Sequence, residues 1–139
     1  MTTKSTGVLV ARVLLAFMFI LAGWSKFADL PGAIAYTASG GIPGFLAVPA
    51  AALEFFGGIA ILVGWQTRWA ALALAAFAVV AGILFHYIPA LGLEGYDRVG
   101  QIINFQKNLT IAGGLLLLAV TGPGLLSLDE RGNRGAALA

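Results

Sequence analysis

The sequence is poor in charged residues and contains no cysteine, and both shortages restrict what this protein can be. Only 10% of its 139 residues are Asp, Glu, Lys or Arg, whereas soluble globular domains carry about 25%. A soluble domain of this length could not hide a chain that is 60% hydrophobic, and a disordered chain would need low hydrophobicity and high charge. The absence of cysteine excludes disulfides, thiolate nucleophiles and Cys-ligated zinc or iron–sulfur centres.

Other classes of site also lack their residues. With one histidine and six carboxylates, the chain is not expected to hold a metal ion by itself. The eight basic residues form no stripe, so nucleic acid is not an expected partner. The glycine-rich and serine motifs of dinucleotide, ATP and serine-hydrolase sites are absent as well.

Long charge-free segments are what the sequence does contain. A helix needs roughly 20 residues to cross the hydrocarbon core of a membrane. Continuous apolar runs also favour helices over the alternating strands of a membrane barrel. We predict a single transmembrane domain over residues 1–139, an all-α integral membrane four-helix bundle. Its spans are expected at about residues 7–27, 46–65, 68–88 and 103–121, followed by a tail over 122–139.

The connections differ in length. A short turn at residues 65–68 joins the second and third spans, whereas residues 28–45 and 89–102 are expected as long outer loops. Asp29 followed by Pro31 is typical of a helix start, and glycines at 40 and 41 end the segment. The first outer loop is therefore predicted to contain a short interfacial helix.

Basic residues orient the bundle. Five of them fall on the side of the termini and three on the other side. The positive-inside rule then places both termini of this multi-pass protein in the cytoplasm, with the lipid bilayer as its surroundings.

Small and polar residues recur at helical spacing in each span and mark the faces expected to pack together. The predicted stripes are Arg12, Ala16, Phe19, Gly23 and Lys26; Ala50, Glu54, Gly57 or Gly58, and Ile61; Ala71, Ala75, Ala78, Gly82 and His86; and Asn104, Lys107, Ile111, Gly114 and Leu118, with Asn108 beside them.

Three ionisable residues of these stripes are expected to converge in the outer half of the bundle. Lys26 and His86 lean inward from the ends of their spans, and Glu54 leans outward from about 12 Å within its span. Lys107 fits the rim of such a site, and Arg12 lies at the opposite end. An unpaired charge at this depth costs about 3 kcal/mol or more, so Glu54 must be paired, protonated or hydrated.

Each residue has a structural alternative beside its functional one. Glu54 is either a proton carrier or headgroup ligand, or one half of an ion pair that fixes helix register. Lys26, Lys107 and Asn108 can instead anchor helix ends at the interface, and His86 can be a hydrogen-bonded interfacial residue. Arg12 is expected to be a structural charge, as an anchor or a helix-pairing residue.

The order of these residues resembles the DoxX family of small four-helix bacterial membrane proteins over residues 8–129. The resemblance is carried by Arg12, Gly23-Trp-Ser-Lys26-Phe27, Glu54-Phe-Phe-Gly57-Gly58, Gly64, Thr67-Arg68, His86, Lys107-Asn108 and Gly122-Pro123-Gly124-Leu-Leu-Ser127-Leu128-Asp129. It implies a location in the bacterial cytoplasmic (inner) membrane and a redox role linked to quinones, as a subunit or partner of an oxidoreductase. Since the chain has no cysteine and no flavin, haem or nicotinamide motif, no covalently bound cofactor is expected, and redox chemistry would come from a quinone or a partner protein.

The leading hypothesis is a polar pocket for a quinone headgroup in a quinone-linked oxidoreductase subunit. Glu54 and His86 are the expected catalytic groups. Lys26 and His86 would donate to quinone carbonyls, Glu54 would exchange a proton, and Lys107 and Asn108 would complete the binding set. The alternatives are a non-catalytic assembly subunit of a membrane complex and, less supported because no inverted repeat is found, a transporter of protons or small solutes.

Overall fold

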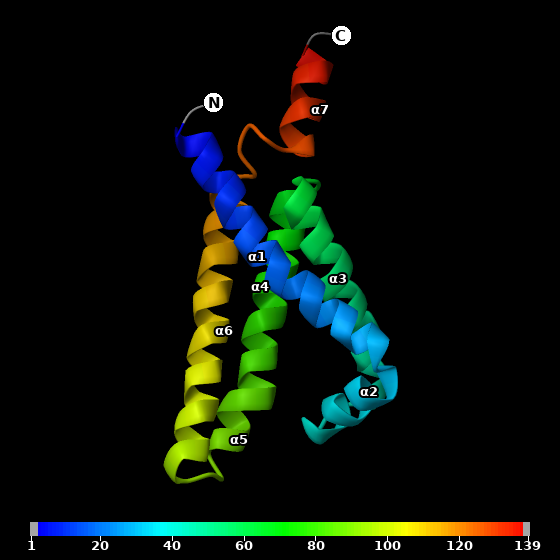
Figure 1. The fold of residues 1–139 in the computed structure, drawn as a ribbon, viewed down its shortest axis with the longest axis vertical. Helices are drawn as coiled ribbons and strands as arrows, with labels where there is room; N and C mark the ends of the chain where they lie inside the picture. Colours follow the sequence, from blue (N-terminus) through cyan, green and yellow to red (C-terminus); the bar gives the residue numbers. More distant parts are fainter. Residues whose placement is uncertain (1–2, 138–139) are drawn as a thin grey trace.

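The computed structural model describes residues 3–137, with side chains up to residue 132, and every regular element in that range is helical. In chain order these elements are α1 (Thr3–Ala28), α2 (Leu30–Ser39), the 3-10 turn η1 (Gly44–Leu46), α3 (Ala47–Val63), α4 (Thr67–Gly82), the π-helical turn η2 (Ile83–Tyr87), α5 (Ile88–Ala90), α6 (Gly95–Thr121) and α7 (Leu128–Ala137). In Figure 1, both chain ends and α7 lie at one end of the molecule, here called the terminus end, and α2 and α5 lie at the other, the α2 end.

Four helical segments are long and apolar enough to cross a membrane. They run over Thr3–Ala28, Gly44–Val63, Thr67–Ala90 and Gly95–Thr121, with 20 to 27 residues each. At 1.5 Å per residue, even the shortest spans about 30 Å, the thickness of the hydrocarbon core. Large apolar side chains such as Leu14 and Val120 are exposed along these helices, as a lipid environment requires. The all-α membrane bundle predicted from the sequence is confirmed.

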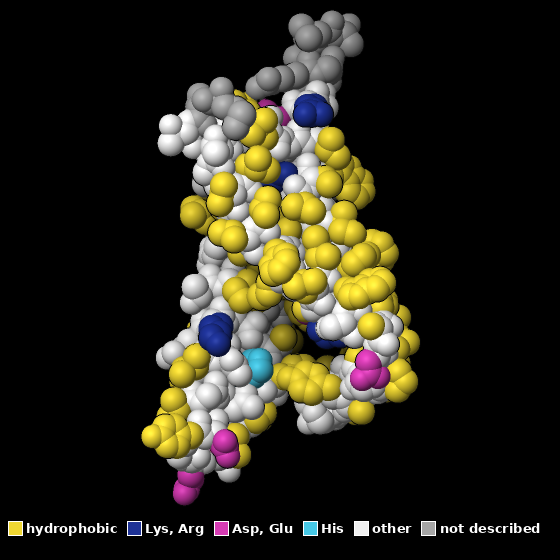
Figure 2. All heavy atoms as spheres, viewed as in Figure 1, with side chains coloured by type: hydrophobic (Ala, Val, Ile, Leu, Met, Phe, Trp, Pro, Cys, Tyr) yellow, Lys and Arg dark blue, Asp and Glu magenta, His cyan; other side chains and the backbone are white. Residues whose placement is uncertain are grey.

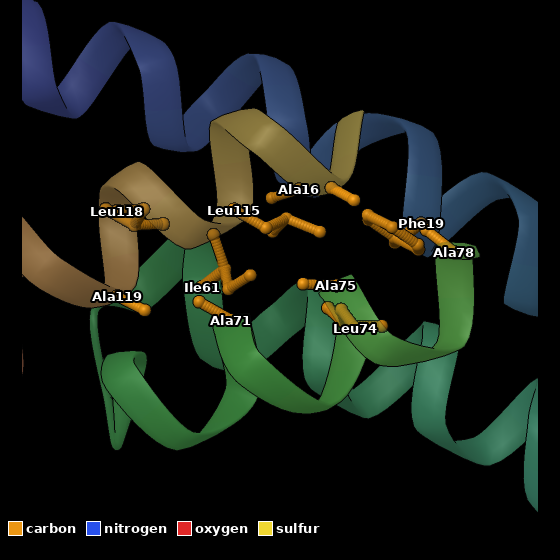
Figure 3. Close-up of a cluster of buried hydrophobic side chains, with 11 residues drawn as sticks. Ala16, Phe19, Ile61, Ala71, Leu74, Ala75, Ala78, Leu115, Leu118 and Ala119 are labelled. Atoms are coloured by element: carbon orange, nitrogen blue, oxygen red, sulfur yellow. The ribbon is translucent and has the colours of Figure 1, made fainter. Parts of the chain in front are cut away.

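The helices pack mainly as two pairs, α1 with α3 and α4 with α6, and the pairs join chiefly through α3 and α4 (Figure 1). Small residues allow the close approach. A Cβ on Gly23 would lie 2.5 Å from the backbone nitrogen of Phe55, and one on Gly58 would lie 3.0 Å from that of Ile20. Figure 3 shows the core between the pairs, where alanines of α4 meet Leu115 of α6 and Phe19 of α1.

The predicted faces are confirmed for the first and third spans. The buried set of α1 is Ser5, Arg12, Ala16, Phe19 and Gly23, and α4 buries Ala71, Ala75, Ala78 and Gly82. The second span buries Ala51 in place of Ala50 beside Glu54, Gly58 and Ile61. The face expected for the fourth span is confirmed in part. Leu118 is buried and Asn104, Asn108, Ile111 and Gly114 are half-buried, but α6 also buries Ala112, Leu115 and Ala119 and leaves Lys107 exposed.

The helix predicted in the first connection is confirmed as α2. The carboxylate of Asp29 accepts a hydrogen bond from the backbone N–H of Gly32 at 3.0 Å, which caps the helix start, and Pro31 lies in the first turn. Gly41 follows the helix end with a positive φ of 77°, a conformation that glycine adopts without strain.

The expectation of a loop over residues 89–102 is wrong. The α4 segment continues through η2 and α5 to Ala90, and α6 already begins at Gly95, so only four residues connect them. Charge-free runs mark the part of a helix that lies in hydrocarbon, whereas the polar first turns of α6, which contain Asp97 and Arg98, extend the same helix beyond that region.

At the terminus end, the segment after α6 is tied to the bundle. The buried guanidinium of Arg12 donates hydrogen bonds to the carbonyls of Ile61, Leu62, Pro123 and Leu126 at 2.6–3.0 Å. Arg12 thus pairs α1 with the end of α3 and with the tail.

Asp129 ties the tail to α4. Its carboxylate accepts hydrogen bonds from the backbone N–H groups of Gln66 and Thr67 at 2.8 and 2.9 Å, where α4 starts. Burial alone would raise the pKa of Asp129, but these hydrogen bonds and the charge of Arg12 outweigh it and hold the pKa below its usual value. The tail therefore includes the cap of α4, and α7 begins beside it.

Candidate functional site

A cavity of about 460 Å³ lies at the α2 end, between the two helix pairs and beside α2. Most of its wall is apolar, from residues such as Phe19, Leu53, Phe77 and Leu84. Its polar side chains come from five elements and are Lys26, Tyr36, Thr37, Glu54, His86 and Asn108. Figure 2 shows a hollow on this part of the surface, with the single histidine near its edge. An apolar pocket with a few convergent polar groups is the usual form of a small-molecule site.

The Lys26–Glu54 ion pair is the charged centre of this cavity. Lys26 lies in the last turn of α1 and Glu54 in the middle of α3, and their Nζ and Oε2 atoms are 2.6 Å apart. The Glu54 side chain is 7% exposed and that of Lys26 is 26% exposed. The pair satisfies the requirement that an intramembrane carboxylate be compensated, and it presents one cation and one carboxylate to the same space.

His86 reaches the cavity from the π-helical turn η2. Its Nδ1 atom lies 2.7 Å from Oε1 of Gln101 on α6. A single π-helical turn inside an α-helix shifts the following side chains around the axis and is frequent at functional sites. Here the turn carries Phe85 and His86, which both line the cavity.

Aromatic rings link α2 to the same turn. The rings of Tyr36 and Phe85 stack with centroids 4.9 Å apart and an interplanar angle of 18°. A Cβ on Gly40 would collide with the Phe85 ring, so this glycine lets the end of α2 lie against η2. Burial raises the pKa of Tyr36, so its hydroxyl stays protonated at neutral pH. Tyr36 and Phe85 therefore form an aromatic wall of the cavity on the α2 side.

Four residues that the sequence singled out thus line one cavity: Lys26, Glu54, His86 and Asn108. Lys107 is exposed on α6 and is not among the lining residues, so the structure does not bring it to the other four. Arg12 lies at the terminus end, as expected for a structural charge. Among the described residues, no group of three His, Asp or Glu side chains is placed to hold a metal ion.

The sequence did not point to three residues that help to form the site: Tyr36, Phe85 and Gln101. Tyr36 and Phe85 meet only because α2 folds back against η2, and a single aromatic in an apolar segment is no signal by itself. Gln101 fell in the expected loop over 89–102. A helical interpretation of that segment would have placed it one turn before Asn104, on the side of α6 that faces α4.

A second cavity, of about 570 Å³, lies at the terminus end. Both signs of charge line it, with Lys4 and Arg68 beside Asp129 and Glu130. Part of this polarity is already used within the fold, because Arg68 donates hydrogen bonds to the carbonyls of Ala119 and Val120, and Asp129 caps α4. The cavity at the α2 end remains the better candidate site.

Several known proteins are similar to this chain over most of its length. The family model described as DoxX matches residues 7–87. Inner membrane protein YqjF of Escherichia coli is 44% identical over 131 residues, which cover 94% of this chain and 95% of YqjF. Inner membrane protein YphA of the same organism is 38% identical, covering 88% of each chain. The Bacillus subtilis protein named "Putative oxidoreductase CatD" is 33% identical, covering 88% of this chain and 84% of its own. No solved structure matches this chain significantly.

Proposed function

This chain belongs to the DoxX family, and we propose that it is an inner-membrane protein whose cavity at the α2 end binds the ring of a quinone-class lipid. Two relatives are named as inner membrane proteins, and a third carries the name "Putative oxidoreductase CatD". In this proposal the chain is a component or partner of a membrane oxidoreductase system, and its termini face the cytoplasm.

The observation that carries the proposal is a compensated Lys–Glu pair inside a mostly apolar cavity between helices that are long enough to cross a membrane. An apolar wall suits the ring and isoprenoid chain of a quinone, and the remaining N–H groups of Lys26 can donate to a ring oxygen. Glu54 lies beside that position and can accept or return one of the two protons that accompany two-electron oxidation or reduction of the ring, and His86, which lines the same cavity, would exchange the other. The electrons would be exchanged with a partner oxidoreductase.

The size of the cavity fits this ligand class. A volume of about 460 Å³ falls within the roughly 300–1,000 Å³ usual for small-molecule pockets. The Tyr36–Phe85 wall offers an aromatic face against which a flat ring can stack.

The test is a binding titration of purified protein in mild detergent with a short-chain benzoquinone, in its oxidised and reduced forms. Glu54→Gln keeps the shape of the side chain and should weaken binding at least about tenfold. Lys107→Gln removes an exposed charge of the same bundle end and should leave binding unchanged. If neither form binds the unaltered protein, the proposal fails. If Glu54→Gln binds normally, the ion pair only fixes helix packing.

A further inference from the structure

The nitrogen atoms of two cavity side chains already donate hydrogen bonds inside the protein. Oε1 of Gln101 can only accept, so the Nδ1 atom of His86, 2.7 Å away, must carry the proton between them. A neutral imidazole protonated at Nδ1 has a lone pair at Nε2. Nε2 has no hydrogen-bond partner among the described residues, so His86 offers an acceptor to the cavity it lines.

Asn108 and Glu54 present acceptors as well. The Nδ2 amide of Asn108 donates one of its two hydrogens to the carbonyl of Asn104 at 3.2 Å, so Oδ1 can accept from a ligand and the second N–H can donate to one. Glu54 forms an ion pair with Lys26 through Oε2, and none of the hydrogen bonds found in the part of the chain that the structure describes is donated to Oε2. His86 and Glu54 thus bring acceptors without a donor to one cavity, and Asn108 adds an oxygen that can also accept.

The donors of the cavity do not balance this set. Lys26 supplies N–H groups, and the hydroxyls of Tyr36 and Thr37 can donate or accept. These three groups suit a ring oxygen in either redox state, so they do not discriminate. Discrimination comes from the acceptors, because a buried acceptor that meets another acceptor stays unpaired and costs free energy.

We infer that the cavity is selective for the reduced, hydroquinone form of its ligand, whose two hydroxyl groups donate to acceptors drawn from His86, Asn108 and Glu54. This inference rests on the proposed function and names the redox state of the substrate. A quinone has only carbonyl oxygens and would leave the acceptors unpaired. The geometry also revises the role expected for His86, which becomes the acceptor of a hydroxyl proton instead of a donor to a carbonyl.

Gln101 is then a positioning residue. It does not line the cavity and acts through His86, whose proton it fixes on Nδ1. Leucine at this position removes the acceptor. Gln106 on the same helix is exposed and provides a matched control position.

The first experiment compares three ligands of one shape by calorimetric titration under anaerobic conditions: tetramethylbenzoquinone, its hydroquinone, and the dimethyl ether of that hydroquinone. We expect the hydroquinone to bind at least about tenfold tighter than the other two, since one lost hydrogen bond to a buried acceptor is worth about this factor. Equal binding of quinone and hydroquinone, or tighter binding of the quinone, overturns the inference and leaves the proposed function standing. Absence of binding by all three overturns both.

The second experiment separates positioning from simple structural support. Gln101→Leu should reduce the ratio of hydroquinone to quinone affinity to within about threefold, whereas Gln106→Leu should keep the ratio of the unaltered protein. A ratio unchanged in a folded Gln101→Leu variant contradicts the role of Gln101.

A measurement on the unaltered protein covers the case in which this variant does not fold. His86 is the one histidine of the sequence, so ¹⁵N-histidine labelling of protein freed of any tag gives a single imidazole in the NMR spectrum. The neutral ring should carry its proton on Nδ1. A proton on Nε2 overturns the inference.

Discussion

Replacing Lys26 by Met removes the cation of the Lys26–Glu54 pair and leaves a carboxylate alone inside the bundle. Loss of one partner from a fully buried ion pair costs about 3–5 kcal/mol. The Glu54 side chain is 7% exposed, but that of Lys26 is 26% exposed, so water reaches part of the pair. We therefore expect Lys26→Met to lower the free energy of unfolding by about 1–3 kcal/mol.

A double-variant cycle isolates the pair. The combined Lys26→Met/Glu54→Gln variant removes both charges, so it should be more stable than the sum of the single changes predicts, with a coupling of about 1–2 kcal/mol. Reversible unfolding in mixed detergent micelles, followed by circular dichroism, gives the four free energies. Lys107→Met, at an exposed cation of α6, should change the free energy by less than about 0.5 kcal/mol. Strict additivity, with Lys26→Met as mild as Lys107→Met, would refute the ion pair.

Further substitutions test the contacts that hold the helices and the tail together, by thermal unfolding in one detergent. Gly23→Ala presses a methyl group against the backbone of α3 and should lower the free energy of unfolding by about 1–3 kcal/mol. The control Gly113→Ala adds a methyl group that meets no atom within 4 Å and should be neutral or stabilising. Equal effects of the two changes would contradict the close contact. Arg12→Lys cannot reproduce the planar fork that reaches four carbonyls and should cost about 2 kcal/mol or more, so wild-type stability would contradict its role. Asp129→Ala should cost about 1–2 kcal/mol through the lost cap of α4. Because folding lowers the pKa of Asp129, the contribution of this carboxylate to the free energy of unfolding is present above about pH 4 and is lost as the pH falls through the lowered value. Asp129→Asn should therefore make stability fall less steeply at acid pH. An unchanged fall in stability at acid pH would show that other groups produce it.

The parts of the fold that follow from hydrophobic content and helical spacing were predictable. The four spans, the buried face of α1 and the capped helix α2 all follow from local sequence patterns, because the hydrophobicity and spacing of nearby residues determine them. The extent of α6 did not follow, because a helix can continue into the aqueous region with polar residues, and the turns around Asp97 resemble a loop by composition.

The candidate site was predictable only where depth and charge specify it. The convergence of Lys26, Glu54 and His86 follows from the cost of charge in a membrane. Lys107 is exposed on α6 and does not line the cavity, because the side chain of this residue points outward from the bundle. The π-helical turn that orients His86 and the contact of His86 with Gln101 depend on tertiary packing, so no spacing of residues in the sequence predicts them. Backbone carbonyls are present at every residue, so the acceptors of Arg12 had no signature either.

The central claim, that the cavity at the α2 end holds a quinone-class lipid, is tested most directly by mass spectrometry of lipids extracted with the protein from its native membrane. Ala81 lines the cavity and Ala76 is exposed on the same helix, so Ala81→Phe fills the site while Ala76→Phe adds the same ring outside it. We expect quinone-class lipid in about stoichiometric amount with the unaltered protein and with Ala76→Phe, and its loss in Ala81→Phe. Quinone no more abundant than in the surrounding membrane, or an equal amount in Ala81→Phe, would contradict the claim.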